Sequence, residues 1–118
     1  MKKRVVITGI GAITPIGKTA NETWNGIKNK ECGVDEIKLF NAENFKTKFD
    51  AEVKDFNPLD YLDMKQAKRL DRSSQFAIIA GREALKDSGI TTENTDFNNV
   101  GVFVSSGIGG LTTIQQQC

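Results

Sequence analysis

The fold class is decided by the stretch VVITGIGAITPIG, which spans residues 5–17. Its first four residues are β-branched and do not alternate with polar residues, which is typical of a strand buried on both faces of a parallel sheet. The strand is expected to end in a glycine-rich turn from Gly9 to Gly17. A second apolar run at residues 100–105 predicts another buried strand, which leads into the glycines of residues 107–110.

Helices are expected between and after these strands. Thr19 and Glu22 have the spacing of a capping box, so a helix should run over residues 20–31, with Gly33 as its stop. The other expected elements are a short strand within residues 49–53, a brief helical turn started by Asn57 and Pro58, a long helix over residues 64–88 closed by Gly89, and a helix over residues 111–117.

This order of strands and helices places the chain in the α/β class. Two buried parallel strands cannot cover the apolar faces of these helices, and the last predicted helix has no cap at residues 115–118. We therefore expect residues 1–118 to be part of a larger α/β domain.

The composition narrows the possible chemistry. The 118 residues include no histidine, which excludes Ser-His-Asp triads, Cys-His pairs and imidazole metal sites within this chain. The 16 basic and 15 acidic residues give a net charge of +1, so the overall charge does not favour nucleic acid or a membrane as a partner. Cys32 and Cys118 show neither a disulfide-rich pattern nor metal-site spacing, which favours a cytoplasmic protein. We expect no metal, no cofactor and no catalytic cysteine in this chain.

Two faces are predicted for the helix over residues 64–88. Its core stripe is Ala67, Leu70, Ser74, Ala77, Ile78, Gly81 and Leu85. Lys65, Lys68, Arg69 and Arg72 lie on the other face, four cations within about two turns. Such a cluster can bind a partner's carboxylates or phosphates, including those of nucleic acid, and an ordinary solvated helix face is the alternative.

The second half of this predicted helix is apolar on both sides. Phe76 and Ile79 project toward the basic face, while Ala77 and Ile78 remain on the core stripe. We expect a second subunit or further chain to cover this half, which favours an oligomeric protein.

The two glycine-rich turns leave alternatives open. Gly9 and Gly11 after a strand suggest dinucleotide binding, but the third glycine of that motif is replaced by Thr14 and Pro15 follows it. A tight packing turn is favoured, and a small nucleotide-binding module is the alternative function. Ile108 lies between glycines at the carboxyl end of a predicted strand, where it can line an apolar pocket or fill the core.

Taken together, residues 5–17, Trp24 and the segment SSGIGGL at residues 105–111 resemble the N-terminal part of the β-ketoacyl-acyl carrier protein synthase II family. Residues 48–56 and 64–71 also fit, so the similarity covers essentially the whole chain as the N-terminal portion of the synthase N-terminal domain. The resemblance implies a thiolase-like αβαβα layered fold, incomplete in this chain, and a homodimer. It also implies elongation of fatty acyl chains by decarboxylative Claisen condensation of acyl-carrier protein with malonyl-carrier protein.

The resemblance also implies roles for particular residues. In this family a cysteine, two histidines and a lysine perform the reaction, and all of them would lie beyond residue 118, so the chain alone is expected to be inactive. Lys65, Lys68 and Arg69 match the positions that receive the acidic carrier protein, and Ile108 matches an acyl-pocket residue that gates longer chains. Arg72 extends the basic stripe by its helical spacing only. Neither nucleic acid nor a membrane is implied as a partner.

Overall fold

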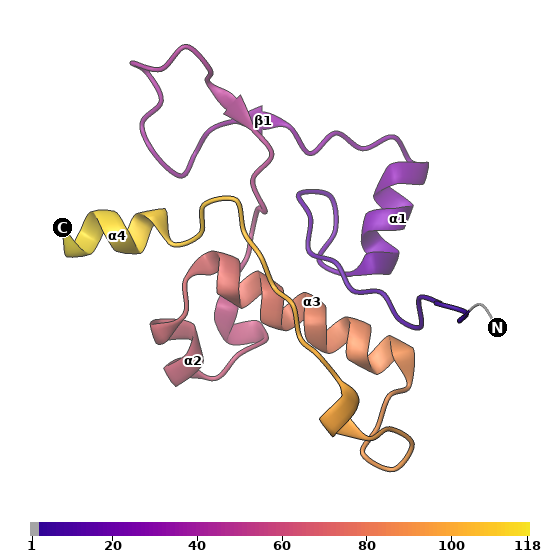
Figure 1. Cartoon of the computed structure of the whole chain (residues 1–118). Helices are drawn as coiled ribbons and strands as arrows, with labels where there is room; N and C mark the ends of the chain where they lie inside the picture. Colours follow the sequence, from indigo (N-terminus) through magenta and orange to yellow (C-terminus); the bar gives the residue numbers. More distant parts are fainter. Residues whose placement is uncertain (1–2) are drawn as a thin grey trace. The chain divides into compact units, whose positions relative to one another are not determined.

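The computed structural model describes residues 3–118 (Figure 1). The chain divides into two compact units, which we describe separately. The helical unit contains residues 3–11 and 57–118, and the hairpin unit contains residues 12–56.

The helical unit is built around one long helix. Its elements are the short 3-10 helix η1 (Pro58–Asp60), α2 (Met64–Arg69), α3 (Arg72–Ser88), the 3-10 helix η2 (Phe97–Asn99) and α4 (Leu111–Gln117). Only Leu62, Ile79 and Gln75 are buried among its described residues, at 5%, 8% and 7% exposure. The turn at Asn57 and Pro58 and the helix over residues 111–117 are confirmed.

The long helix predicted over residues 64–88 is wrong, because the chain forms two helices there (Figure 1). Leu70 has an extended backbone, with φ −99° and ψ 134°, and this residue ends α2. The side-chain amide of Gln75 donates hydrogen bonds to the carbonyls of Ala67 and Leu70, both at 3.0 Å. These bonds satisfy carbonyls at the end of α2, so the break costs little. The predicted stop of α3 at Gly89 is confirmed, with φ 66°.

The two predicted parallel strands are not present in the described part of the chain. Residues 5–8 and 100–105 pair with no strand there, since β1 and β2 form the one sheet of the described residues. The side chains expected to be buried are exposed, for example Val5 at 94% and Phe103 at 97%. A parallel strand is stable only beside a neighbouring strand and under covering helices, and the described residues supply neither here.

The hairpin unit begins with α1 (Ala20–Lys28), whose start is confirmed. The Thr19 hydroxyl accepts a hydrogen bond from the Glu22 amide at 3.1 Å, as the capping box predicts. The Glu22 carboxylate reaches back to the amide of Lys18, at 2.7 Å, instead of that of Thr19. The predicted end near residue 31 and the stop at Gly33 are wrong, because α1 already ends at its cap residue, Asn29.

A two-stranded antiparallel ladder completes the hairpin unit. β1 (Asp35–Glu36) pairs with β2 (Phe49–Asp50), and Glu36 lies opposite Phe49. In the connection between them, the rings of Phe40 and Phe45 meet edge to face at 5.6 Å. The short strand predicted within residues 49–53 is confirmed for Phe49–Asp50, whereas its partner β1 was not predicted.

No helix of the described residues is both long and apolar enough to cross a lipid bilayer.

Candidate functional site

Three positively charged side chains of α2 form no ion pair within the described chain. Lys65, Lys68 and Arg69, which we call the basic cluster, are all exposed on this six-residue helix. Both ion pairs of the described residues involve Asp35 in the hairpin unit, so no carboxylate neutralises the basic cluster within the described chain. Lys68 and Arg69 lie in the last turn of α2, where the helix dipole favours positive charge. The basic cluster is therefore available to a partner's carboxylates.

An open hollow lies beside the basic cluster, with a volume of about 430 Å³. It is lined by Asp63, Lys65, Gln66, Arg69, Leu70 and Ile78. Leu70 and Ile78 are half-buried and contribute the apolar part of the lining, while Lys65 and Arg69 contribute charge. An apolar side chain flanked by acidic residues fits such a surface, since burial and charge pairing can act together.

Contrary to the prediction, Arg72 does not extend the basic cluster. It is the first residue of α3, on the other side of the break at Leu70 and Asp71. Its guanidinium lies over the Phe76 ring, 5.1 Å from the ring centre, and it is half-buried. Ile79 was expected to be covered by a second subunit or further chain, whereas the helical unit itself buries this side chain to 8% exposure.

Ile108 lies in the glycine-rich segment of residues 106–110, which we call the glycine loop, and it is 74% exposed. A hollow of about 380 Å³ adjoins this loop. It is lined by Asp71, Ser73, Ser74, Phe76, Ala77, Val104, Ser105, Ser106 and Gly109. Ile108 is not among these lining residues, so the structure places it on the surface next to the hollow.

Sequence reasoning missed the importance of Asp71 and Gln75. Asp71 is the N-cap residue of α3, and its carboxylate accepts a hydrogen bond from the Thr113 hydroxyl, which comes from α4. Gln75 is the buried amide that closes the end of α2. One signal was available, because aspartate favours N-cap positions over helix interiors.

The turn at Gly9 and Gly11 is a close packing contact with α3. A Cβ atom on Gly9 would overlap the backbone of Ala84 and Ser88, and one on Gly11 would overlap the backbone of the same helix. The Ile10 amide donates to the Asp87 carboxylate at 2.9 Å. An amide that a phosphate would need is thus already bound to a carboxylate, which favours the packing interpretation over nucleotide binding.

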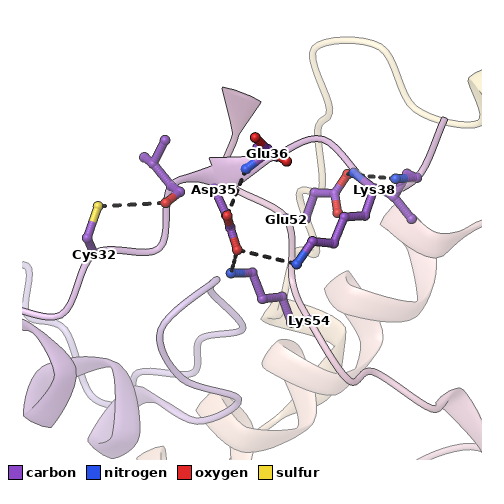
Figure 2. Close-up of polar contacts among 8 residues, drawn as sticks. Cys32, Asp35, Glu36, Lys38, Glu52 and Lys54 are labelled. Carbon is purple, nitrogen blue, oxygen red and sulfur yellow. Dashed lines mark hydrogen bonds and ion pairs between the residues drawn. The ribbon is translucent and has the colours of Figure 1, made fainter. Parts of the chain in front are cut away.

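A second polar cluster links β1 to Lys54, which follows β2 in the hairpin unit (Figure 2). Asp35 accepts hydrogen bonds from Lys54 at 2.6 Å and from the Glu36 amide at 2.9 Å, and Lys38 lies 3.5 Å away. The bond from Lys54, followed by that from the Glu36 amide, lowers the pKa of Asp35 to about 2. The same bond to Asp35 raises the pKa of Lys54. All these groups pair with one another, which indicates a structural role.

The two cysteines lie at the surface of the described chain. Cys32 and Cys118 are both exposed and free, and the Cys32 thiol donates to the Val34 carbonyl at 3.9 Å (Figure 2). The described residues contain no group of three or more histidine, cysteine, aspartate or glutamate side chains that could hold a metal ion.

Comparison with known proteins assigns the family. Residues 2–117 match the model of the β-ketoacyl synthase N-terminal domain. The 3-oxoacyl-[acyl-carrier-protein] synthases 2 of Synechocystis sp. and Staphylococcus aureus are each 41% identical to the chain, over 98% and 96% of its length. That of Vibrio harveyi is 40% identical over 97% of the chain. The chain spans 28%, 27% and 28% of the lengths of these three relatives.

A solved structure gives the same result. The ishigamide ketosynthase/chain length factor superposes on 75% of this chain with a TM-score of 0.63 and 30% sequence identity, and the match covers 22% of that protein. The name of this fold neighbour thus includes a ketosynthase. The chain belongs to the β-ketoacyl synthase family and matches its N-terminal domain.

Proposed function

We propose that residues 1–118 form the N-terminal portion of a β-ketoacyl-acyl carrier protein synthase, an acyltransferase of fatty acid biosynthesis. The observation that carries the proposal is the 40–41% identity, over nearly the whole chain, to relatives named 3-oxoacyl-[acyl-carrier-protein] synthase 2. The layered thiolase-like fold, a homodimeric state and a cytoplasmic location belong to the same proposal and are supported by the family resemblance.

The proposed reaction has two stages. An acyl group first moves from the carrier-protein thiol to an enzyme cysteine, which releases the carrier thiol. Malonyl-carrier protein then loses CO₂, and the resulting carbanion attacks the acyl thioester carbon and releases the cysteine thiolate. These steps need a base or acid near neutrality, and this chain has no histidine. We therefore assign the chain a binding and scaffolding role and no catalytic residue.

The basic cluster is the proposed docking surface for acyl carrier protein. Lys65, Lys68 and Arg69 are exposed and unneutralised within the described chain, and the adjoining hollow offers apolar contact at Leu70 and Ile78. An acidic carrier protein would contact both the positive charges and the apolar side chains. The charges would mainly speed its association and fix its orientation.

Ile108 is the proposed contact with the acyl chain. Its side chain is 74% exposed in the described chain, so it is free to contact a bound acyl group. The glycines on either side carry no side chains that would shield it. A branched apolar residue at this place can restrict which acyl chains fit.

A charge-reversal experiment on the full-length protein tests the docking proposal. With Lys65→Glu and Arg69→Glu together, we expect the KM for acyl-carrier protein to rise about tenfold or more while kcat changes little, because the acidic partner now meets like charge. The matched control is Lys28→Glu with Lys46→Glu, which changes the net charge equally at exposed positions of the hairpin unit. Unchanged carrier affinity at low salt in the first variant would refute the docking surface.

A further inference from the structure

The glycine loop is fastened to the start of α3 by a contact between residues 42 positions apart. The hydroxyl of Thr113, in the first turn of α4, donates a hydrogen bond to the Asp71 carboxylate. Because α4 begins at Leu111, directly after the glycine loop, this bond fixes the end of the loop on which Ile108 lies.

The backbone of the glycine loop approaches the same place closely. A Cβ atom on Gly110 would lie 2.9 Å from the Asp71 carboxylate, and one on Gly109 would lie 3.0 Å from the Ser73 hydroxyl. Gly110 also has a φ of 71°, which side chains other than glycine rarely adopt. Two successive glycines therefore let the loop contact Asp71 and the first turn of α3.

Asp71 makes this contact instead of capping its own helix. It occupies the N-cap position of α3 with an extended backbone, yet its side chain makes no capping hydrogen bond. Aspartate at such a position ordinarily accepts a bond from an amide of the first helical turn. Here the carboxylate is used for the link to α4.

We propose that Asp71 and Thr113 form a latch that holds the glycine loop, which carries Ile108, at the start of α3. Asp71 and Thr113 are thus positioning residues, not catalytic ones. The consequence for acyl-chain selection rests on the proposed function, whereas the latch itself does not. Without the latch the loop gains mobility, and Ile108 restricts long acyl chains less.

The test compares three variants of the full-length protein. Thr113→Val removes the hydroxyl while keeping the shape of the side chain, and Thr113→Ser keeps a hydroxyl and should restore the wild-type behaviour. Thr112→Val is the matched control, because Thr112 is the preceding, exposed residue of α4. The two measurements are hydrogen exchange of residues 106–111 and kcat/KM for a long and a short acyl-carrier protein.

For Thr113→Val we expect amide exchange in the glycine loop to accelerate about tenfold, the size of effect that loss of a hydrogen bond to a charged group has. The ratio of kcat/KM for the long over the short acyl chain should rise about threefold or more, and neither change should occur in Thr112→Val. Unchanged exchange in Thr113→Val overturns the latch.

If Thr113→Val exchanges faster but keeps the wild-type ratio of kcat/KM for the long over the short acyl chain, the latch does not position Ile108 for chain selection. This outcome applies when the wild-type protein elongates acyl chains. If the wild-type protein elongates no acyl chain, the proposed function fails, and the exchange comparison still decides the latch on its own.

Discussion

At the scale of the residue, Gln75 shows how one buried side chain controls a surface feature. Its amide is 7% exposed and donates to the carbonyls of Ala67 and Leu70, so it fixes the end of the helix that carries the basic cluster. For Gln75→Leu we expect the free energy of local opening of α2 to fall by about 1–3 kcal/mol, because two carbonyls lose their donor. Hydrogen exchange of the α2 amides measures this change.

The matched control for this prediction is Gln116→Leu, which makes the same substitution at an exposed glutamine of α4. It should leave exchange in α2 unaltered. Equal exchange rates in Gln75→Leu and the wild type would show that the amide does not hold α2.

At the scale of the element, the break between α2 and α3 explains what the sequence pattern could and could not predict. Periodicity over residues 64–88 is helical throughout, and no glycine or proline marks the break. The break depends instead on Asp71, which leaves helical geometry at the start of α3, and on the distant contact that it makes with Thr113. Lys65, Lys68 and Arg69 share one helix as predicted, because they all precede the break, although this helix is much shorter than predicted and Arg72 follows the break.

The strand β1 escaped prediction for a related reason. Two residues carry too little pattern to predict a strand, and the pair Asp35–Glu36 contains acidic residues that are rare in strands. The ladder forms where the side chains of Lys54 and Lys38 reach Asp35 (Figure 2). By contrast, the start of α1 depends on the local pair Thr19 and Glu22, and it was predicted correctly.

A pH titration tests whether the ion pair with Lys54 lowers the pKa of Asp35. The pKa of Asp35 is lowered to about 2 from the ordinary value of 3.8, so its contribution to the stability of the hairpin unit is complete above about pH 4 and is lost as the pH falls through 2. In Lys54→Gln we expect the Asp35 pKa to move up toward 3.8, as followed by NMR of the carboxyl carbon. Lys46→Gln, at an exposed residue outside the cluster, should leave the titration unchanged. An unshifted midpoint in Lys54→Gln would contradict the ion-pair explanation.

At the scale of the whole molecule, the sequence identifies two apolar runs but does not predict whether they are buried. Residues 5–8 and 100–105 have the composition of buried strands, yet Val5 and Phe103 are almost fully exposed in the described chain. The composition of a segment indicates which side chains a strand there would bury. Whether they are buried depends on neighbouring strands and helices, which the pattern of one segment does not specify. The family was nevertheless identified, because it depends on the order of the motifs and not on how they pack.

The absence of histidine gives the last prediction, which separates binding from catalysis. We expect the 118-residue chain by itself to release no CO₂ from malonyl-carrier protein above background, because it contains no imidazole to act as acid or base. The same chain should still bind acyl carrier protein at low salt through the basic cluster, and this binding should weaken as ionic strength shortens the range of the charges. Carbon dioxide release measures the first expectation, and equilibrium titration over a range of salt concentrations measures the second. The chain carrying Lys65→Glu and Arg69→Glu is the control for binding. Decarboxylation by the chain alone would show that its own residues supply the chemistry, whereas binding that is indifferent to salt would place the carrier away from α2.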